Sequence, residues 1–225
     1  IWNYPETKSG KRKLGPIYLD TPPYPEALLQ SVNYTGFAAL YGDTTTIIEP
    51  GDIWDKLLLE YCHGQRTRPV WGVSTADFHK DDDSGEILGN FPTVFFVKNK
   101  TKSDVLSALN KGRMYACRGK YPQRIILDKF SVGSDIRNMA VSGEGIKMKS
   151  NPWVHIYLSS KVASKAITRV KIIRSGIVIK TFDGTMPMEI DYEDIYYNPG
   201  EKVFYRIDVK SPGQLISNPI FVTFE

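Results

Sequence analysis

The sequence contains few of the residues from which proteins build metal and redox centres. Its 225 residues include two cysteines and three histidines. Cys62 and Cys117 fit neither a CxxC motif nor another spacing of metal ligands, so a cysteine-based metal site is excluded. The spacing leaves open whether the two thiols form a disulfide or stay reduced.

Long apolar runs and nucleotide-binding motifs are also missing. No stretch approaches the roughly 20 apolar residues of a membrane-spanning helix, which predicts a chain without a transmembrane segment. There is no glycine-rich phosphate loop, no nucleophile elbow and no dinucleotide fingerprint. The chain starts at Ile1 inside a strand-like stretch, from which we expect that an N-terminal part has been removed.

A strong excess of one charge is absent as well. The net charge is +4, and the shares of hydrophobic residues (41%) and charged residues (24%) are typical of a globular protein. The densest basic cluster comprises Lys8, Lys11, Arg12 and Lys13. Because no aromatic or helical pattern organises this cluster, we interpret it as a solvated loop and predict no nucleic-acid partner. The length of the chain suits two domains.

Residues 1–121 alternate strand and helix signals. Strands are predicted at residues 1–4, 36–41, 69–75, 92–97 and 114–117, and helices at residues 24–31, 53–61 and 105–111. Asp52 is a typical N-cap, Thr101 and Asp104 have the spacing of a capping box, and Gly112 ends the last helix. Strands separated by helices of this length favour β-α units, so the first predicted domain has a mainly parallel sheet.

From residue 122 to residue 225 the pattern changes to short alternating runs. Val154, Ile156 and Leu158 share one face of a predicted strand. Ser175-Gly176 lies between two apolar runs and is typical of a hairpin turn. Strands at this spacing predict a second, all-β domain, an immunoglobulin-like sandwich over residues 122–225.

One short segment combines a carboxylate with an imidazole. Asp77 and His79 are two residues apart at the carboxyl end of the strand predicted at 69–75, where α/β folds place their sites. In an extended chain both side chains project to the same side and converge on one point. Because an oxygen donor and a nitrogen donor together suit Zn, Mn or Fe, we predict that Asp77 and His79 bind such a divalent metal. The alternative is a hydrogen-bonded pair at a strand end.

The surroundings of this pair resemble a known family. They are similar to the C-terminal part of the polymerase-and-histidinol-phosphatase (PHP) family, whose metal-binding barrel ends with an Asp-x-His pair followed by a helix and a strand. The resemblance rests on Asp77 and His79, on Ala108, Leu109, Gly112, Arg113 and Tyr115, on the Tyr205-Arg206 strand, and on the Ser217-Asn218-Pro219-Ile220 stretch. The last two resemble the tail domain of some PHP-type metallohydrolases.

This resemblance implies both a fold and a reaction. Residues 1–121 would form the C-terminal part of a distorted α/β barrel, with its N-terminal part missing, ahead of the all-β immunoglobulin-like sandwich. Members of the family bind two or three metal ions, which activate a water molecule to attack a phosphoester or a related bond. Arg113 is the candidate substrate-binding residue, because a guanidinium binds phosphate through two hydrogen bonds; a surface ion pair is the alternative.

The sequence departs from the family at the other ligand positions. The opening His-x-His motif is missing, and Tyr4 stands where a family member would carry a histidine. We therefore expect the full-length parent to be a metal-dependent hydrolase, and this chain by itself to be incomplete for catalysis. The alternative is a non-catalytic binding or scaffolding protein, whose sandwich contacts a glycan or a protein.

The sequence also suggests binding partners, a cellular location and roles for the remaining polar residues. The hydrolase hypothesis implies a small-molecule phosphoester or related substrate. Missing strands would expose sheet edges, which predicts partner contacts, a homo-oligomer or a rearranged sheet. A sandwich with few cysteines slightly favours the periplasm or surface of a bacterium over the cytoplasm. His63 is interpreted as a helix-end residue, His155 as a partly exposed strand residue, and Asp81, Asp82 and Asp83 as a solvated loop.

Overall fold

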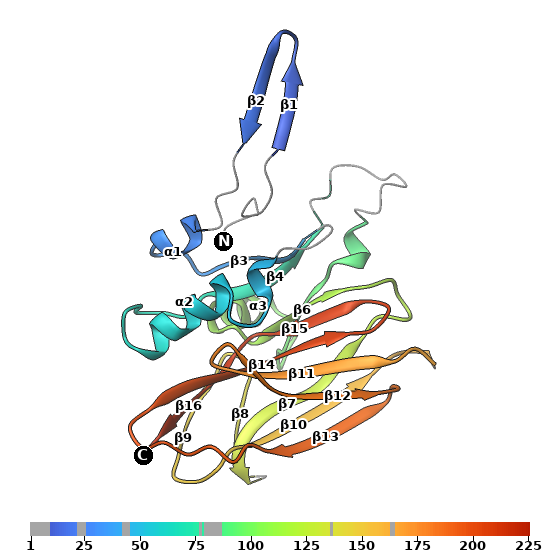
Figure 1. Ribbon diagram of the computed structural model, residues 1–225. Helices are drawn as coiled ribbons and strands as arrows, with labels where there is room; N and C mark the ends of the chain where they lie inside the picture. Colours follow the sequence, from blue (N-terminus) through green and yellow to red (C-terminus); the bar gives the residue numbers. More distant parts are fainter. Residues whose placement is uncertain are drawn as a thin grey trace.

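The computed structural model describes residues 10–21, 26–41, 46–76, 78, 87–135, 137–162 and 165–225 (Figure 1). Strands predominate, with 46% of residues in strands and 15% in helices. The helices are α1 (Ala27–Gln30), α2 (Ile53–Cys62) and α3 (Lys102–Lys111), and the 3-10 helices are η1 (Thr46–Ile48) and η2 (Leu88–Asn90). The first strands are β1 (Gly10–Leu14), β2 (Ile17–Thr21), β3 (Gly36–Tyr41), β4 (Trp71–Thr75), β5 (Thr93–Phe95) and β6 (Met114–Arg118).

The rest of the chain contains strands and no helix among its described residues. These strands are β7 (Ile126–Asp135), β8 (Asn138–Val141), β9 (Gly145–Met148), β10 (Trp153–Ser159), β11 (Thr168–Arg174), β12 (Ile177–Gly184), β13 (Met188–Glu193), β14 (Lys202–Lys210), β15 (Gln214–Ser217) and β16 (Ile220–Phe224). They build most of two sheets, one four-stranded with the order β13-β10-β7-β8 and one eight-stranded with the path β12-β11-β14-β15-β6-β5. β16 joins the larger sheet beside β14 and continues it in parallel to β9.

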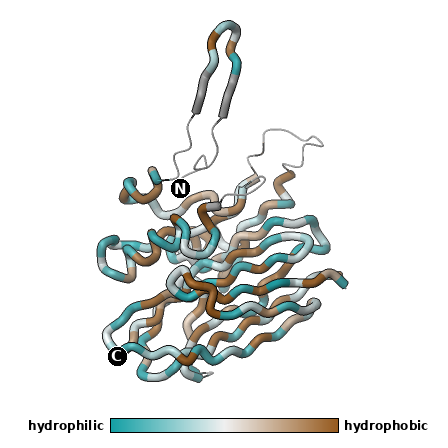
Figure 2. Tube along the Cα trace, viewed as in Figure 1, coloured by the Kyte–Doolittle hydropathy of each residue, from teal (hydrophilic) through white to brown (hydrophobic). Residues whose placement is uncertain are grey.

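The two large sheets enclose one core and the larger sheet borders a second. Along β14, Val203 and Tyr205 pack into the core shared with the four-stranded sheet. Phe204 points to the other face, into the core that contains Trp54 of α2. This alternation follows from the two-residue period of a strand, and Figure 2 shows apolar and polar residues alternating along the strands. The eight-stranded sheet is therefore the middle layer, between the four-stranded sheet and the layer formed by α2, β3 and β4.

The β3-α2-β4 unit is the part of the fold that the sequence patterns described best. β3 and β4 pair in parallel, from Gly36↔Trp71 to Tyr41↔Thr75. The Asp52 side chain accepts the Ile53 amide (2.7 Å) and caps α2, as predicted. Two further predicted elements are confirmed in α3 and β6, where Thr101 accepts the Asp104 amide at 3.1 Å.

The fold-class prediction is wrong. Only β3 and β4 form a parallel pair in the first part of the chain, and no described sheet closes into a barrel. β5 and β6 instead enter the eight-stranded sheet, where β6 pairs antiparallel with β15 through Cys117↔Leu215. A β-α alternation indicates that strands exist, but it does not decide which neighbour each strand pairs with. Here β6 pairs with β15, so one sheet spans the predicted domains 1–121 and 122–225.

A single asparagine fills the gap between β4 and β6. The Gly72 amide donates to Asn218 Oδ1 (2.8 Å), and Asn218 Nδ2 donates to the carbonyl oxygens of Gly72 (3.0 Å) and Met114 (3.1 Å). Further along, Ser74 Oγ donates to the Cys117 carbonyl (3.0 Å). Gly72 thus lies beside Met114 and Ser74 beside Cys117, which means that β4 and β6 run in the same direction.

The predicted loop at the basic cluster is a hairpin in the structure. β1 and β2 pair antiparallel and turn at Gly15, whose φ is +61°. In Figure 1 the hairpin extends away from the sheets, and Leu14, Ile17 and Tyr18 are exposed at its tip. The strand predicted at residues 1–4 and the beginning of the helix predicted at 24–31 lie outside the described residues. None of the described helices has the length and apolarity that crossing a membrane requires.

Candidate functional site

The carboxyl ends of three strands meet at one edge of the molecule, here called the carboxyl edge. β3 ends at Tyr41, β4 at Thr75 and β6 at Arg118, and all three strands run in the same direction. Ala76, which follows β4, is buried. The chain therefore leaves this edge directly into Asp77 and His79. Both of these predicted metal ligands lie outside the described residues, and the exposed Phe78 is described between them.

The last residues of β4 are held by side-chain hydrogen bonds to β5 and β6. The Ser74 amide donates to Thr93 Oγ1 (2.9 Å), and Thr93 Oγ1 donates back to the Ser74 carbonyl (3.2 Å). The Ser74 hydroxyl donates to the Cys117 carbonyl of β6 (3.0 Å). These bonds fix the position at which the chain leaves the sheet, three residues before Asp77. A fixed support of this kind is what a functional constellation needs.

A basic pocket opens on the same edge, at the end of β6. The cavity, here called the edge pocket, has a volume of about 390 Å³. Its lining residues are Asn90, Phe91, Arg118, Gly119, Lys120, Gln123, Arg124, Pro212 and Gly213. They include two guanidinium groups and one ammonium group, and none of these described lining residues is acidic. Such a lining favours an anion, because guanidinium groups bind phosphate and carboxylate through paired hydrogen bonds.

The walls of the edge pocket are close to one another and braced. The Gly119 amide donates to the Asn90 carbonyl (2.9 Å), and Arg124 Nη1 donates to the Gly89 carbonyl (2.9 Å). A Cβ atom added to Gly213 would lie 2.2 Å from the Arg118 carbonyl oxygen, so only glycine allows this approach. The pocket is therefore preformed by contacts between the segment that precedes β5 and the segments that follow β6 and β14.

The predicted metal site stays a prediction. Within the described ranges, no group of three His, Cys, Asp or Glu side chains is placed to hold a metal ion. His63 is exposed at the end of α2. His155 Nδ1 forms a hydrogen bond with Asp191 across neighbouring strands, which agrees with its interpretation as a strand residue.

Arg113 lies away from the carboxyl edge. It precedes β6, at the amino end of that strand, and its Nη2 is 3.1 Å from Glu144 Oε1. Arg113 and Arg118 are separated by the length of β6, about 16 Å at the usual rise of an extended chain. The structure thus does not bring Arg113 to the edge at which β4 ends.

Sequence patterns did not predict the edge pocket. Arg118 and Lys120 follow the strand predicted at 114–117. This pair of basic residues is the one sequence signal that could have indicated an anion site there. Arg124 and Gly213 reach the pocket through tertiary contacts, which periodicity does not report.

The two cysteines are free thiols, and burial raises the pKa of both Cys62 and Cys117 to about 12. Such thiols stay protonated and are poor nucleophiles.

A scan against protein-family models and searches of curated proteins and solved structures found no match for this chain.

Proposed function

We propose that this chain contributes the carboxyl edge of a metal-dependent hydrolase that acts on a phosphoester or a related anionic ester. The observation that carries the proposal is the shared edge: the strand that leads into Asp77 and His79 ends beside the strand that leads into the edge pocket. Metal-assisted hydrolysis of a phosphoester needs metal ligands and a group that binds the anion, on the same side of the scaffold.

Each part of the edge has a role in this proposal. Asp77 and His79 would hold a divalent Zn, Mn or Fe ion, which when bound supplies an activated water molecule at neutral pH. Arg118, Lys120 and Arg124 would orient the anionic group and offset the negative charge that develops on it. Catalytic zinc sites use three protein ligands, so the site requires at least one more donor. Asp81, Asp82 and Asp83 follow closely in the sequence and are candidates for it.

Metal content is the first test of the proposal. The protein and an Asp77→Ala/His79→Ala variant would be dialysed against trace Zn, Mn and Fe and measured by elemental analysis. His63→Ala is the matched control, because it removes an exposed imidazole at the end of α2. We expect near-stoichiometric metal in the protein and in the control, and loss of metal in the double variant. Equal metal content in all three proteins would exclude Asp77 and His79 as ligands.

Hydrolysis of p-nitrophenyl phosphate tests the second half of the proposal. The variant Arg124→Gln removes one cation from the edge pocket and is expected to raise KM, while Lys129→Gln on the exposed surface of β7 is expected to leave it unchanged. The edge pocket would lose its assigned role if both variants had the same KM as the protein. A metal-bound protein without any phosphoesterase activity would restrict the proposal to metal binding.

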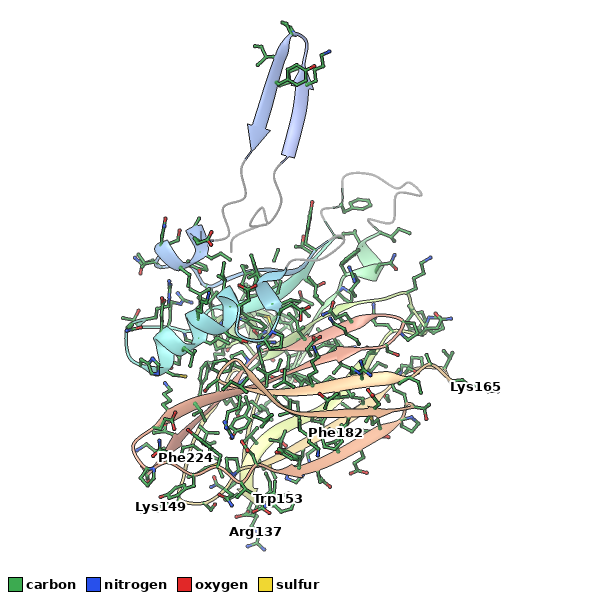
Figure 3. The ribbon with its side chains drawn as sticks, in the orientation of Figure 1. Arg137, Lys149, Trp153, Lys165, Phe182 and Phe224 are labelled. Carbon is green, nitrogen blue, oxygen red and sulfur yellow. The ribbon has the colours of Figure 1, made fainter. Side chains whose placement is uncertain are left out.

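A second candidate function has one specific observation in its favour. Trp153, His155 and Tyr157 form a row on the outer face of β10, and both Trp153 and Tyr157 are exposed. Glu189 and Asp191 lie opposite on β13. In Figure 3, Trp153 is at the end of the molecule opposite the β1-β2 hairpin. Exposed aromatic rings beside carboxylates suit a neutral glycan, because rings stack on sugar faces and carboxylates accept hydroxyl hydrogen bonds.

The glycan alternative is tested by binding to a panel of neutral oligosaccharides. Trp153→Ala should abolish binding, while Tyr121→Ala, an exposed aromatic residue elsewhere, should leave it intact. No binding by the protein itself would remove this alternative.

A further inference from the structure

A second, larger cavity lies at the opposite end of β4 and β6 from the carboxyl edge. It has a volume of about 960 Å³ and is here called the amino-edge groove. Its lining residues are Tyr61, Pro69, Trp71, Lys111, Arg113, Asn138, Gly143, Glu144, Gly145, Ile146, Lys147, Lys202, Phe221 and Thr223. They come from α2, α3, β4, β8, β9, β14 and β16 and from the turns between these elements, so both predicted domains contribute to the groove.

The charges around the groove are strongly unequal. Lys111, Arg113, Lys147 and Lys202 line it, against a single lining carboxylate, that of Glu144. Glu144 pairs with Arg113 at 3.1 Å, and Lys147 Nζ lies 2.6 Å from an oxygen of Glu225. After both pairs are taken into account, the ammonium groups of Lys111 and Lys202 still add positive charge on two sides of the groove. This excess favours an anionic occupant.

The floor of the groove is aromatic. Trp71 and Phe221 are buried, and the Tyr61 ring meets the Phe221 ring edge-on with centroids 4.8 Å apart. Lys202 Nζ lies 3.8 Å from the centroid of the Tyr61 ring. This cation-π contact restrains the ammonium group at the wall of the groove. Basic walls over an apolar floor give a site in which a bound anion is partly shielded from water, where charge pairs are stronger.

Arg113 lines the groove with a guanidinium group that is only partly buried. Arg113 Nε is buried and forms no hydrogen bond with the described residues, although Nη2 of the same guanidinium group reaches Glu144. The Arg113 side chain as a whole is 39% exposed and lines the groove, so its cation is available to an anion beside Glu144. A phosphate or sulfate oxygen is a suitable acceptor for a guanidinium N–H.

The groove is held in shape by a close backbone contact. The turn between β8 and β9 presses on the end of α3, so that a Cβ atom added to Gly143 would lie 1.9 Å from the Lys111 carbonyl oxygen. The Gly143 amide donates to the Pro219 carbonyl (2.8 Å). These contacts fix the backbone of Lys111 beside that of Gly143 and Glu144 in the wall of the groove. Preformed cavities of roughly 300–1,000 Å³ are the usual size of small-molecule sites.

We propose that the amino-edge groove binds a small molecule that carries two or more phosphate or sulfate groups. Its cations come from α3, β9 and β14, and several anionic groups on one molecule can pair with cations on different elements. The site is separate from the carboxyl edge and does not depend on the metal or on hydrolysis. It also gives Arg113 an anion-binding role at a different place from the expected substrate site.

Titration with inorganic tripolyphosphate tests the proposal, followed by intrinsic tryptophan fluorescence because Trp71 lies in the floor. Lys111→Gln/Lys202→Gln removes the two ammonium groups without carboxylate partners among the described residues. We expect this variant to bind roughly tenfold more weakly or worse, since two attractive charges are lost. Lys129→Gln/Lys161→Gln removes two exposed lysines of the sandwich and should bind like the unaltered protein. Lys111→Arg/Lys202→Arg keeps both charges and should restore binding.

Further measurements distinguish phosphate ligands from sulfate ligands and the amino-edge groove from the edge pocket. Tripolyphosphate should bind more tightly than pyrophosphate and much more tightly than orthophosphate, and a disulfated sugar tests whether sulfate groups substitute for phosphate groups. If Lys120→Gln/Arg124→Gln weakens tripolyphosphate binding while the Lys111/Lys202 variant does not, the anion occupies the edge pocket and the proposal is wrong. No binding of tripolyphosphate or the disulfated sugar at low ionic strength would also overturn it.

Discussion

Arg206 of β14 and Asp55 of α2 form an ion pair that is fully enclosed by the protein. Arg206 Nε lies 2.6 Å from Asp55 Oδ1 and Nη2 lies 2.7 Å from Oδ2, and neither side chain is exposed. Nη2 also donates to the Ile48 carbonyl (3.0 Å), and the guanidinium group lies 4.8 Å from the Trp54 ring centroid. The pair fixes α2 in one position on the eight-stranded sheet.

Removing the charge of Asp55 should be strongly destabilising. Asp55→Asn leaves the Arg206 guanidinium buried without a counter-charge, and we expect the free energy of unfolding to fall by about 3–5 kcal/mol. Urea unfolding followed by fluorescence measures this change. Asp183→Asn is the control, because its ion pair with Arg169 is exposed and should leave the midpoint unchanged. Equal midpoints for the two variants would contradict the importance of the enclosed pair.

The Asn218 side chain should contribute strongly to the free energy of unfolding. Asn218→Ala removes the three hydrogen bonds that join β4 to β6 and leaves buried backbone groups of Gly72 and Met114 unpaired. We expect a loss of about 2–4 kcal/mol in the free energy of unfolding. Asn198→Ala removes an exposed amide that bonds Glu201, and it should have little effect. Hydrogen exchange would show whether the loss begins at β4.

The Tyr205 hydroxyl supports a buried carboxylate. It donates to Asp194 Oδ2 (2.7 Å), which also accepts from Arg174 Nη1 at 2.6 Å. Burial, then the hydrogen bond to Asp194, raises the pKa of Tyr205. Tyr205→Phe should lower the free energy of unfolding by about 1–3 kcal/mol, because Asp194 loses a donor where water is excluded. Tyr157→Phe, on an exposed face, should be neutral in the same urea experiment.

Stability should fall at alkaline pH. Burial raises the pKa of Cys117 from 9.0 to about 12, and it also raises the pKa of Tyr115 from 10.0 to about 12. Above pH 9 the unfolded chain therefore releases protons that the folded chain retains, which favours unfolding as the pH rises towards 12. Urea midpoints at pH 8 and pH 10.5 should differ in that direction. In a Cys62→Ala/Cys117→Ala variant the difference should shrink; an unchanged difference would rule out the thiols as its source.

Local chemistry predicted local structure well in this chain. Asp52 and Thr101 were recognised as caps because their side-chain oxygens satisfy backbone amides within the next few residues, and the structure shows both bonds. Ser175-Gly176 was recognised as a turn because positive φ angles suit these positions, and the turn joins β11 to β12 with φ values of +48° and +86°. Each of these signals involves residues that are close in sequence.

Contacts between distant residues were not predictable from such signals. Nothing in the periodicity of residues 114–117 indicates that β6 pairs with β15, or that Arg118, Arg124 and Gly213 meet around one pocket. The hairpin of β1 and β2 is a local structure that was also missed, because its basic residues were interpreted as a solvated loop. The Asp77 and His79 prediction rests on sequence alone, and the carboxyl edge supplies the setting for it.

The core around Trp54 includes residues from the C-terminal part of the sequence, and this affects how the chain folds during synthesis. Phe204, Ile216 and Phe221 pack in the core around Trp54, although they are translated long after it. A chain that emerges from its amino end therefore has α2 available well before the residues that cover it exist. We expect folding to be completed only after nearly all of this sequence has left the ribosome, with the apolar face of α2 depending on chaperones until then.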